Sequence, residues 1–215
     1  MAKVFLSAGH GGTDPGAVAN GLREKDINLR ILLACKDELE RHGVSVVCSR
    51  VTDTNDPVTE EVREANTSKA DIAVSFHTNA GKGDGSETFY FSSNTRGKKL
   101  AELCEKHTKQ IGQNSRGAKV GDRLYFIRKT IMPAVLCECA FVDNKTDKAI
   151  IDTAEEQKKF GVAYAKAILE YFGVKYEDQT LYRVQIGAYR NLENAKAALK
   201  KAKAAGFVSA FIDKA

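Results

Sequence analysis

The chain has 215 residues, of which 43% are hydrophobic and 28% charged, and its formal net charge is +5. This composition excludes disorder, collagen and coiled coil for the body of the chain, and the length allows one domain with a small appendage. The mild positive charge is typical of a lysine-rich surface, and it also allows weak attraction to a polyanion such as nucleic acid or an anionic cell-wall polymer. Because no nucleic-acid-binding motif is present, we expect no nucleic-acid partner.

The N-terminal sequence has no feature of a leader or a membrane anchor. Its apolar run is short and is followed at once by polar glycines, unlike a signal peptide. No stretch approaches the roughly 20 apolar residues of a membrane span. We therefore expect a protein that is made in the cytoplasm without a signal peptide and that does not insert into membranes.

Strand and helix patterns alternate along the first four fifths of the chain. Short apolar and β-branched runs predict strands at 3–8, 44–48, 71–77, 87–92 and 133–140, and a weaker run is compatible with a strand at 124–128. Helical spacing of apolar residues predicts helices at 24–41, 57–70, 95–112 and 155–172. This alternation indicates an α/β domain, residues 1–174, with a largely parallel twisted sheet flanked by helices.

The C-terminal tail repeats the pattern on a smaller scale. The polar segment 175–180 predicts a linker. After it, the sequence predicts a strand at 181–186, a helix at 192–205 and a strand at 207–212. Residues 181–215 are therefore expected to form one β-α-β unit, which is too small to bury much core by itself.

Five cysteines lack the paired spacings of a disulfide framework or of a cysteine zinc site. They are Cys35, Cys48, Cys104, Cys137 and Cys139. We expect buried, reduced thiols. Cys137 and Cys139 flank Glu138 in an apolar run, and alternation along a strand would direct both thiols to one face and the carboxylate to the other.

Three side chains suited to metal binding occur where predicted elements begin or end. His10 follows the first strand in a Gly-His-Gly-Gly loop, His77 ends the strand at 71–77, and Glu24 opens the first helix. In open α/β sheets, ligands bind at the carboxyl ends of strands, where these residues would converge. Two imidazoles and a carboxylate suit Zn²⁺ and leave a fourth position for water, whose pKa the ion would lower.

Glu138 lies in the apolar run Pro133–Phe141. A carboxylate in such surroundings must be paired, protonated or functional, because burying it alone is costly. A general base that takes a proton from water and passes it to a leaving amine needs this kind of placement.

Each of these residues also has a purely structural interpretation. A histidine at position 10 or 77 would then be an ordinary surface or core residue, as we expect for His42 and His107 on polar helix faces. Glu24 would complement the positive end of a helix dipole, and Glu138 would be a buried salt-bridge partner. Spacing alone does not decide between these interpretations and a metal site.

Ordered motifs over about residues 2–173 resemble the zinc-dependent N-acetylmuramoyl-L-alanine amidases. They are Ser7–Ala17, Gly21–Lys25, Arg50 with Asp53, Arg63–Asn66, Ser75–Ala80, Gly85–Glu87, Arg116–Lys119 and Pro133–Glu138 with Asn144. So many motifs in the same order are far more specific than the single Gly-His-Gly-Gly.

The resemblance implies hydrolysis of the amide between the lactyl group of N-acetylmuramic acid and the L-alanine of the stem peptide. It implies that His10, Glu24 and His77 bind one Zn²⁺ and that Glu138 is the catalytic base. Asn79 and Arg116 are candidate substrate contacts. The family usually has small residues on either side of the base, and this chain has cysteines there, which changes the surroundings of the base.

The tail resembles the start of a SPOR repeat domain, from Leu181–Tyr189 with Asn191, Ala195 and Leu199. Such domains bind peptidoglycan glycan strands that lack stem peptides, and a complete one has two halves of this kind. We therefore expect peptidoglycan as the partner. The half-length tail would pair with a second chain as a homodimer, dock on the catalytic domain, or be a remnant.

The leading hypothesis is a peptidoglycan amidase that lyses cell walls. The missing signal peptide favours a bacteriophage endolysin released through a permeabilised membrane, with a bacterial autolysin, such as one acting in mother-cell lysis, close behind. Two other hypotheses are a catalytically silent wall-binding module and a zinc amidohydrolase of small soluble peptides.

Overall fold

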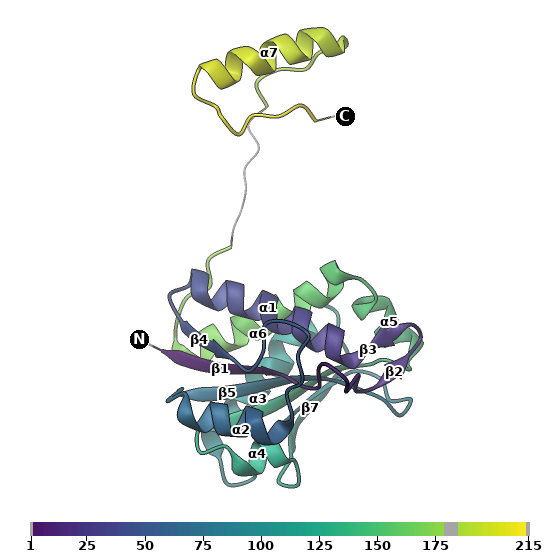
Figure 1. The fold of residues 1–215 in the computed structure, drawn as a ribbon, viewed down its shortest axis with the longest axis vertical. Helices are drawn as coiled ribbons and strands as arrows, with labels where there is room; N and C mark the ends of the chain where they lie inside the picture. Colours follow the sequence, from purple (N-terminus) through teal and green to yellow (C-terminus); the bar gives the residue numbers. More distant parts are fainter. Residues whose placement is uncertain (1, 179–184, 214–215) are drawn as a thin grey trace. The chain divides into compact units, whose positions relative to one another are not determined.

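The computed structural model describes residues 2–178 and 185–213, and the chain divides into two compact units, Met1–Glu177 and Asp178–Ala215 (Figure 1). The first residues of the predicted linker pack on the larger unit. Tyr176 stacks on His42 with ring centroids 4.9 Å apart, and the backbone N–H of Glu177 donates to His42 Nε2 at 2.9 Å. The boundary between the units therefore lies within 175–180, after three residues that belong to the first unit.

The larger unit is built on a six-stranded sheet in the order β4-β1-β5-β8-β6-β7. The strands are β1 (Lys3–Ala8), β4 (Ser45–Cys48), β5 (Ile72–Asn79), β6 (Ser86–Tyr90), β7 (Ser115–Val120) and β8 (Ala134–Phe141). The first four in this order are mutually parallel, and β6 runs antiparallel to β8. The largely parallel sheet expected from the sequence is confirmed. A short antiparallel pair, β2 (Val18–Ala19) and β3 (Leu22–Arg23), stands apart from it.

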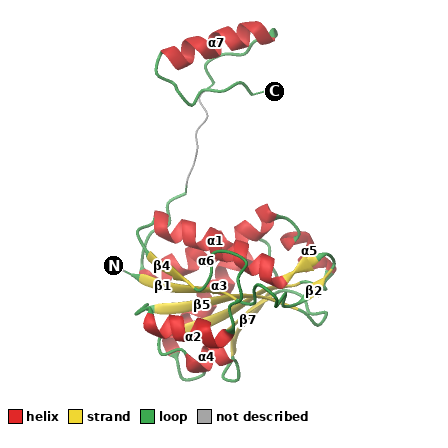
Figure 2. Cartoon of the chain, viewed as in Figure 1, coloured by secondary structure: helices red, strands yellow, loops and turns green. Residues whose placement is uncertain are grey.

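Helices cover both faces of this sheet (Figure 2). One face carries α1 (Glu24–Arg41), α3 (Thr95–Gln110) and α6 (Ala154–Phe172), and the other carries α2 (Val58–Thr67) and α4 (Tyr125–Lys129). A further helix, α5 (Lys145–Ile151), follows β8. The side chains of β1 alternate between the two cores: Val4 and Leu6 pack under α1 and α6, and Phe5 packs under α2 and α4.

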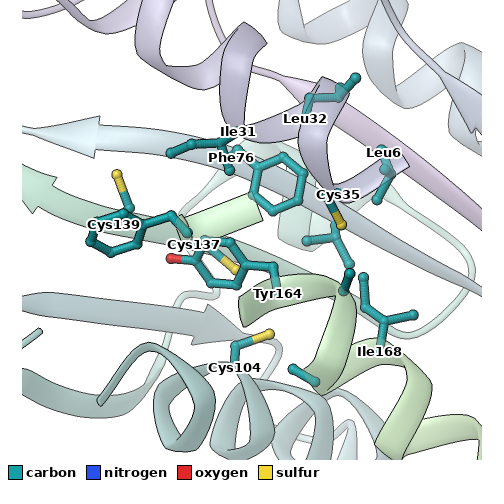
Figure 3. Packing of buried hydrophobic residues seen from close by; sticks show 14 of the residues in the cluster. Leu6, Ile31, Leu32, Cys35, Phe76, Cys104, Cys137, Cys139, Tyr164 and Ile168 are labelled. Atoms are coloured by element: carbon teal, nitrogen blue, oxygen red, sulfur yellow. The ribbon is translucent and has the colours of Figure 1, made fainter. Parts of the chain in front are cut away.

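The core beneath α1, α3 and α6 contains the cysteines (Figure 3). Cys35, Cys104, Cys137 and Cys139 are buried and all five cysteines are free, as expected, although Cys48 is partly exposed. Alternation along β8 directs Cys137 and Cys139 into this core, beside Phe76 and Tyr164 in Figure 3, and Glu138 to the opposite face.

Three parts of the larger unit differ from the sequence prediction. The strand compatible with residues 124–128 is wrong: the segment forms the helix α4, which buries the adjacent residues Phe126 and Ile127 in one core. Strand β7 was not predicted, because it lies at the sheet edge and its sequence has no apolar run. Helix α5 is short and was not predicted, although the Asn144 side chain caps it by accepting from two backbone N–H groups.

The smaller unit contains one helix, α7 (Leu192–Ala204), where the sequence predicts one. Neither predicted strand is formed among its described residues, which are 178 and 185–213, and residues 181–184 of the first strand lie outside them. Apolar side chains that the strands would bury stay largely exposed, including Ile186, Phe207 and Val208. A strand needs a partner for its backbone groups, and α7 alone does not supply one.

Across the described parts of the chain, no helix has the length and apolar character needed to cross a membrane.

Candidate active site

His10, Glu24 and His77 meet at the carboxyl ends of β1 and β5, and their candidate ligand atoms lie within 4.8 Å of one another. The distance from His10 Nε2 to Glu24 Oε2 is 3.3 Å, and that from His77 Nδ1 to Glu24 Oε1 is 3.0 Å. The two imidazole rings stand nearly perpendicular, with centroids 5.3 Å apart. Three residues separated by up to 67 positions therefore face one point.

Glycines in the loop after β1 make this convergence sterically feasible. A Cβ at Gly9 would lie 2.1 Å from the His77 ring, and a Cβ at Gly16 would lie 2.6 Å from Glu24 Oε2. Gly16 and His10 both have positive φ, 64° and 66°, which is unusual for a histidine and indicates a tightly specified loop. The buried Arg50 side chain holds the start of this loop by donating from Nε to the Ala8 carbonyl at 2.9 Å.

The carboxylate of Glu24 is fixed by donors from three elements. The backbone N–H groups of Ala17 and Thr78 donate to it at 2.8 and 3.0 Å. Asn28, one turn along α1, donates at 3.3 Å and is itself held by the Thr78 hydroxyl at 2.9 Å. This network orients both oxygens of Glu24 before any ion binds.

Asp14 accepts a hydrogen bond from His10 Nδ1 at 2.8 Å. This contact leaves His10 Nε2 directed at Glu24. A carboxylate that accepts from the second ring nitrogen of a histidine in this way is a common support of metal ligands in proteins. The sequence motif around His10 contains Asp14, but its role was not identified from the sequence, because only the loop geometry brings it to the ring.

Hydrogen bonds within the ligand cluster, which is formed by His10, Glu24 and His77, shift the pKa values of all three side chains. A hydrogen bond to Glu24 raises the pKa of His10 to about 9, against the opposing effect of burial. Burial acts to raise the pKa of Glu24, but hydrogen bonds from His10 and His77 outweigh it and lower that pKa. Burial acts to lower the pKa of His77, and the bond to Glu24 reverses this. Two imidazoles aimed at one carboxylate in this way match the donor set of a Zn²⁺ site.

Glu138 lies beside the cluster because it is the direct neighbour of His77 across β5 and β8. Its Oε2 is inaccessible and has no hydrogen-bond partner among the described residues. Burial raises the pKa of Glu138 to about 7, although the neighbouring His77 acts to lower it. A carboxyl group with a pKa near neutrality is suited to exchange protons at physiological pH.

The two candidate substrate contacts meet at Glu87, the neighbour of Glu138 on β6. Asn79 donates to Glu87 Oε1 at 3.2 Å, and Arg116 Nε donates to Glu87 Oε2 at 2.8 Å. Lys119 hydrogen-bonds to the same oxygen. Asn79 and Arg116 were predicted from the sequence as substrate contacts, whereas Glu87 and Lys119, which lie in the motifs Gly85–Glu87 and Arg116–Lys119, were not.

Comparison with known proteins gives the family. The profile of the N-acetylmuramoyl-L-alanine amidases matches residues 4–170, and the SPOR domain profile matches residues 163–214. The chain belongs to the N-acetylmuramoyl-L-alanine amidase family. The family resemblance expected from the sequence is thereby confirmed, and so is the reaction: the enzyme cleaves the peptidoglycan amide that joins the stem peptide to N-acetylmuramic acid.

The amidase is similar to whole proteins as well as to isolated domains. It is 34% identical to the N-acetylmuramoyl-L-alanine amidase CwlM of Bacillus licheniformis, over 96% of this chain and 83% of the relative. It is 32% identical to the sporulation-specific N-acetylmuramoyl-L-alanine amidase of Bacillus subtilis, over 97% and 84%. The endolysin of Bacillus phage SPP1 is 38% identical, over 80% and 66%.

Among solved structures, the catalytic domain of the amidase CwlV from Bacillus (Paenibacillus) polymyxa var. colistinus superposes with a TM-score of 0.76 at 32% identity. The match covers 81% of this chain and all of that domain. The amidase fold of the larger unit is thus confirmed.

Proposed function

We propose that His10, Glu24 and His77 hold one zinc ion and that Glu138 is the general base of the amidase reaction. The observation that carries the proposal is the convergence of the three ligand atoms within 4.8 Å, beside a carboxylate with an unpartnered oxygen. The family membership supports it, since these positions fall within the matched residues 4–170.

Each residue of the site has its own role in the proposed reaction. A zinc ion bound there would lower the pKa of a water molecule and polarise the scissile carbonyl. Glu138 accepts the proton of the attacking water and passes it to the departing nitrogen of L-alanine, for which a pKa near 7 allows both steps. Asp14 and Asn28 keep His10 and Glu24 in their orientations throughout.

The variant Glu138→Gln tests the assignment of the base. It should retain bound zinc but lose turnover by at least about 100-fold, because the amide cannot accept the proton. Zinc content is measured by metal analysis, and turnover by the appearance of new alanine amino groups in purified walls. Comparable activity in the variant would refute the role, and release of glycan reducing ends in place of alanine amines would contradict amide cleavage.

We infer that the tail unit associates with the tail of a second copy. Ile186, Phe207 and Val208 are 70%, 61% and 79% exposed, and no strand is formed among residues 185–213. A second copy would supply matching strands and cover these side chains, and a paired tail would resemble the two-halved SPOR domain. Sedimentation velocity should show a concentration-dependent dimer that Val208→Asp abolishes; a monomer at all concentrations would overturn the inference.

We further propose that the enzyme reaches the wall from the cytoplasm after membrane permeabilisation, as in phage or mother-cell lysis. Similarity to an endolysin and to a sporulation-specific amidase supports this role. Expression inside a susceptible cell should cause lysis only when the membrane is also permeabilised. Lysis by the enzyme alone would count against the proposal.

A further inference from the structure

A row of ionisable side chains crosses the sheet on the face opposite the cysteines. His77, Glu138 and Glu87 are direct neighbours on β5, β8 and β6. Residues in register on adjacent strands point to the same face, and strands are about 4.8 Å apart. Glu87 therefore lies about 10 Å from the proposed zinc ligand His77, with Glu138 between them.

Glu87 holds two cationic side chains from β7 at the end of this row. Burial acts to raise the pKa of Glu87, but hydrogen bonds from Lys119 and Arg116 outweigh it and keep the carboxylate charged. Two cations around one carboxylate leave an excess of one positive charge. The Arg116 and Lys119 side chains remain 38% and 37% exposed, so this charge is accessible from solvent.

The guanidinium of Arg116 is fixed from two sides. Its Nε donates to Glu87, and its Cζ lies 5.3 Å from the centre of the Phe141 ring, a stacking distance for a cation on an aromatic face. The hydrogen bond described for Arg116 uses only Nε, which leaves its terminal nitrogens as donors. A planar guanidinium oriented in this way is suited to bind a carboxylate with two hydrogen bonds.

The charge around the ligand cluster is asymmetric. Beyond His10, on the side of β1, the acidic Asp14 side chain is 64% exposed and accepts a hydrogen bond from His10. Beyond Glu138, on the side of β7, lie the cations. An anionic arm of a substrate would be repelled on the first side and attracted on the second.

We propose that Arg116 and Lys119, positioned by Glu87, form a subsite for a carboxylate of the stem peptide. The proposal rests on the zinc chemistry assigned above, which puts the scissile amide at His10, Glu24 and His77. An extended peptide advances about 3.4 Å per residue, so the 10 Å row covers L-alanine and about two residues after it, within reach of an acid group on the residue that follows L-alanine. The subsite thus selects stem peptides that carry a free acid group near L-alanine over those in which that group is amidated.

The test compares two soluble disaccharide peptides that differ at one group. One carries D-glutamate after L-alanine with a free α-carboxylate, and the other carries the corresponding α-amide. The wild-type enzyme should show a kcat/KM about tenfold higher for the carboxylate, the effect of one charge-assisted hydrogen bond. Lys119→Met and Arg116→Met should each reduce this ratio towards one, and Lys119→Arg should largely retain it.

The control Lys98→Met removes an equal charge from α3, where Lys98 is exposed and pairs with Glu102, and should keep the wild-type ratio. A wild-type ratio near one, or an unchanged ratio in both methionine variants, would overturn the subsite. Because the ratio compares two substrates of one enzyme, it does not depend on which group activates the water. Turnover that survives chelation of zinc would refute the role of the metal, and the ratio would still report on the subsite.

Discussion

Two glutamates lie near the same histidines, and their surroundings shift their pKa values in opposite directions. Glu24 accepts hydrogen bonds from two imidazoles and two backbone N–H groups, which lower its pKa and keep it a carboxylate suited to bind a cation. Glu138 has an oxygen with no partner among the described residues, and burial raises its pKa. This difference in pKa supports Glu24 as the proposed ligand and Glu138 as the proposed base.

The pKa of Glu138 makes a prediction about the pH dependence of the reaction. The base works only when deprotonated, so kcat/KM should fall as pH decreases through its pKa, which is about 7 in the metal-free protein. A bound dication stabilises the carboxylate and lowers this pKa, so the acidic limb should have its midpoint at or below about 7. Initial rates on soluble muropeptide between pH 5 and 9 measure the limb, and a midpoint well above 7 would contradict the assignment.

Zinc binding should release protons. The pKa of His10 is raised to about 9 in the metal-free protein, so below that pH the ring carries a proton that the ion must displace. Apparent zinc affinity should therefore increase as pH rises from 6 to 8. Calorimetry in buffers of different ionisation enthalpy counts the protons released, and pH-independent affinity with no proton release would be incompatible with His10 as a ligand.

Asp14 should matter for metal affinity more than its exposure suggests. Asp14→Ala removes the acceptor of the His10 Nδ1 hydrogen bond and should weaken zinc binding by about 10- to 100-fold. Asp37→Ala, at an exposed position on α1 far from the loop, serves as the charge-matched control. Equal zinc affinities in the two variants would show that the hydrogen bond does not support the ligand.

At the scale of elements, the packing of α1 against α6 fixes the position of the glutamate with which α1 begins. The first residue of α1 is the proposed ligand Glu24, and the inner face of α1 packs against the sheet and α6 through residues such as Ile31 and Cys35. Gly161 allows the close approach: a Cβ there would lie 2.5 Å from the Ile31 carbonyl oxygen. The position of a ligand thus depends on a glycine on another helix.

Gly161→Ala should destabilise the protein by about 1–3 kcal/mol, because the added methyl group overpacks the contact between α1 and α6. Alanine is favoured over glycine in helices by about 1 kcal/mol, so propensity alone predicts the opposite sign. Gly97→Ala in α3 is the matched control, since its Cβ would lie 3.4 Å or more from its neighbours and should be neutral or stabilising. Urea denaturation measures both, and a stabilised Gly161→Ala would disprove the tight contact.

At the scale of the whole molecule, the two units have different tasks. The proposed metal ligands, the proposed base and the row of side chains from His77 to Arg116 all lie within Met1–Glu177. The tail contributes one helix and exposed apolar side chains, and it falls within the SPOR match. Hydrolysis of the amide and attachment to the wall should therefore be separable.

A chain that ends after Glu177 should hydrolyse soluble muropeptides at nearly the wild-type rate, because the described hydrophobic clusters of the larger unit are built from residues within Met1–Glu177. Its co-sedimentation with purified peptidoglycan should decrease. Rates on soluble and polymeric substrate, measured side by side, check this. A truncated chain that loses activity on the soluble substrate would show that the tail supports the catalytic unit.

Much of the larger unit is readable from local sequence. The helix at 24–41 has the bounds predicted from its apolar spacing and the glycine that follows it, and β1 coincides with its apolar run. Amphipathic periodicity is a local property that burial on one face preserves. The proposed ligands were also predictable as candidates, because His10 in its glycine-rich loop and His77 stand at the carboxyl ends of strands and Glu24 opens a helix.

Other features were settled by tertiary contacts. Residues 124–128 have the composition of a strand, yet they form α4 because a short helix places Phe126 and Ile127 in the core beside α2. Strand β7 is recognisable only through its pairing with β6. In the tail, residues 207–212 have the apolar pattern of a strand but form none, because strand formation depends on pairing with a neighbour, which the local pattern does not encode.

The sequence by itself determined the family, the four longer helices of the main body, α1, α2, α3 and α6, and the identity of the candidate ligands and base. Only the tertiary structure decided which groups touch: Asp14 on His10, Asn28 on Glu24, and Glu87 between Asn79, Arg116 and Lys119. The reason is physical. Periodicity and turn residues act over a few positions, whereas hydrogen bonds and pKa values depend on neighbours that only the folded sheet brings together.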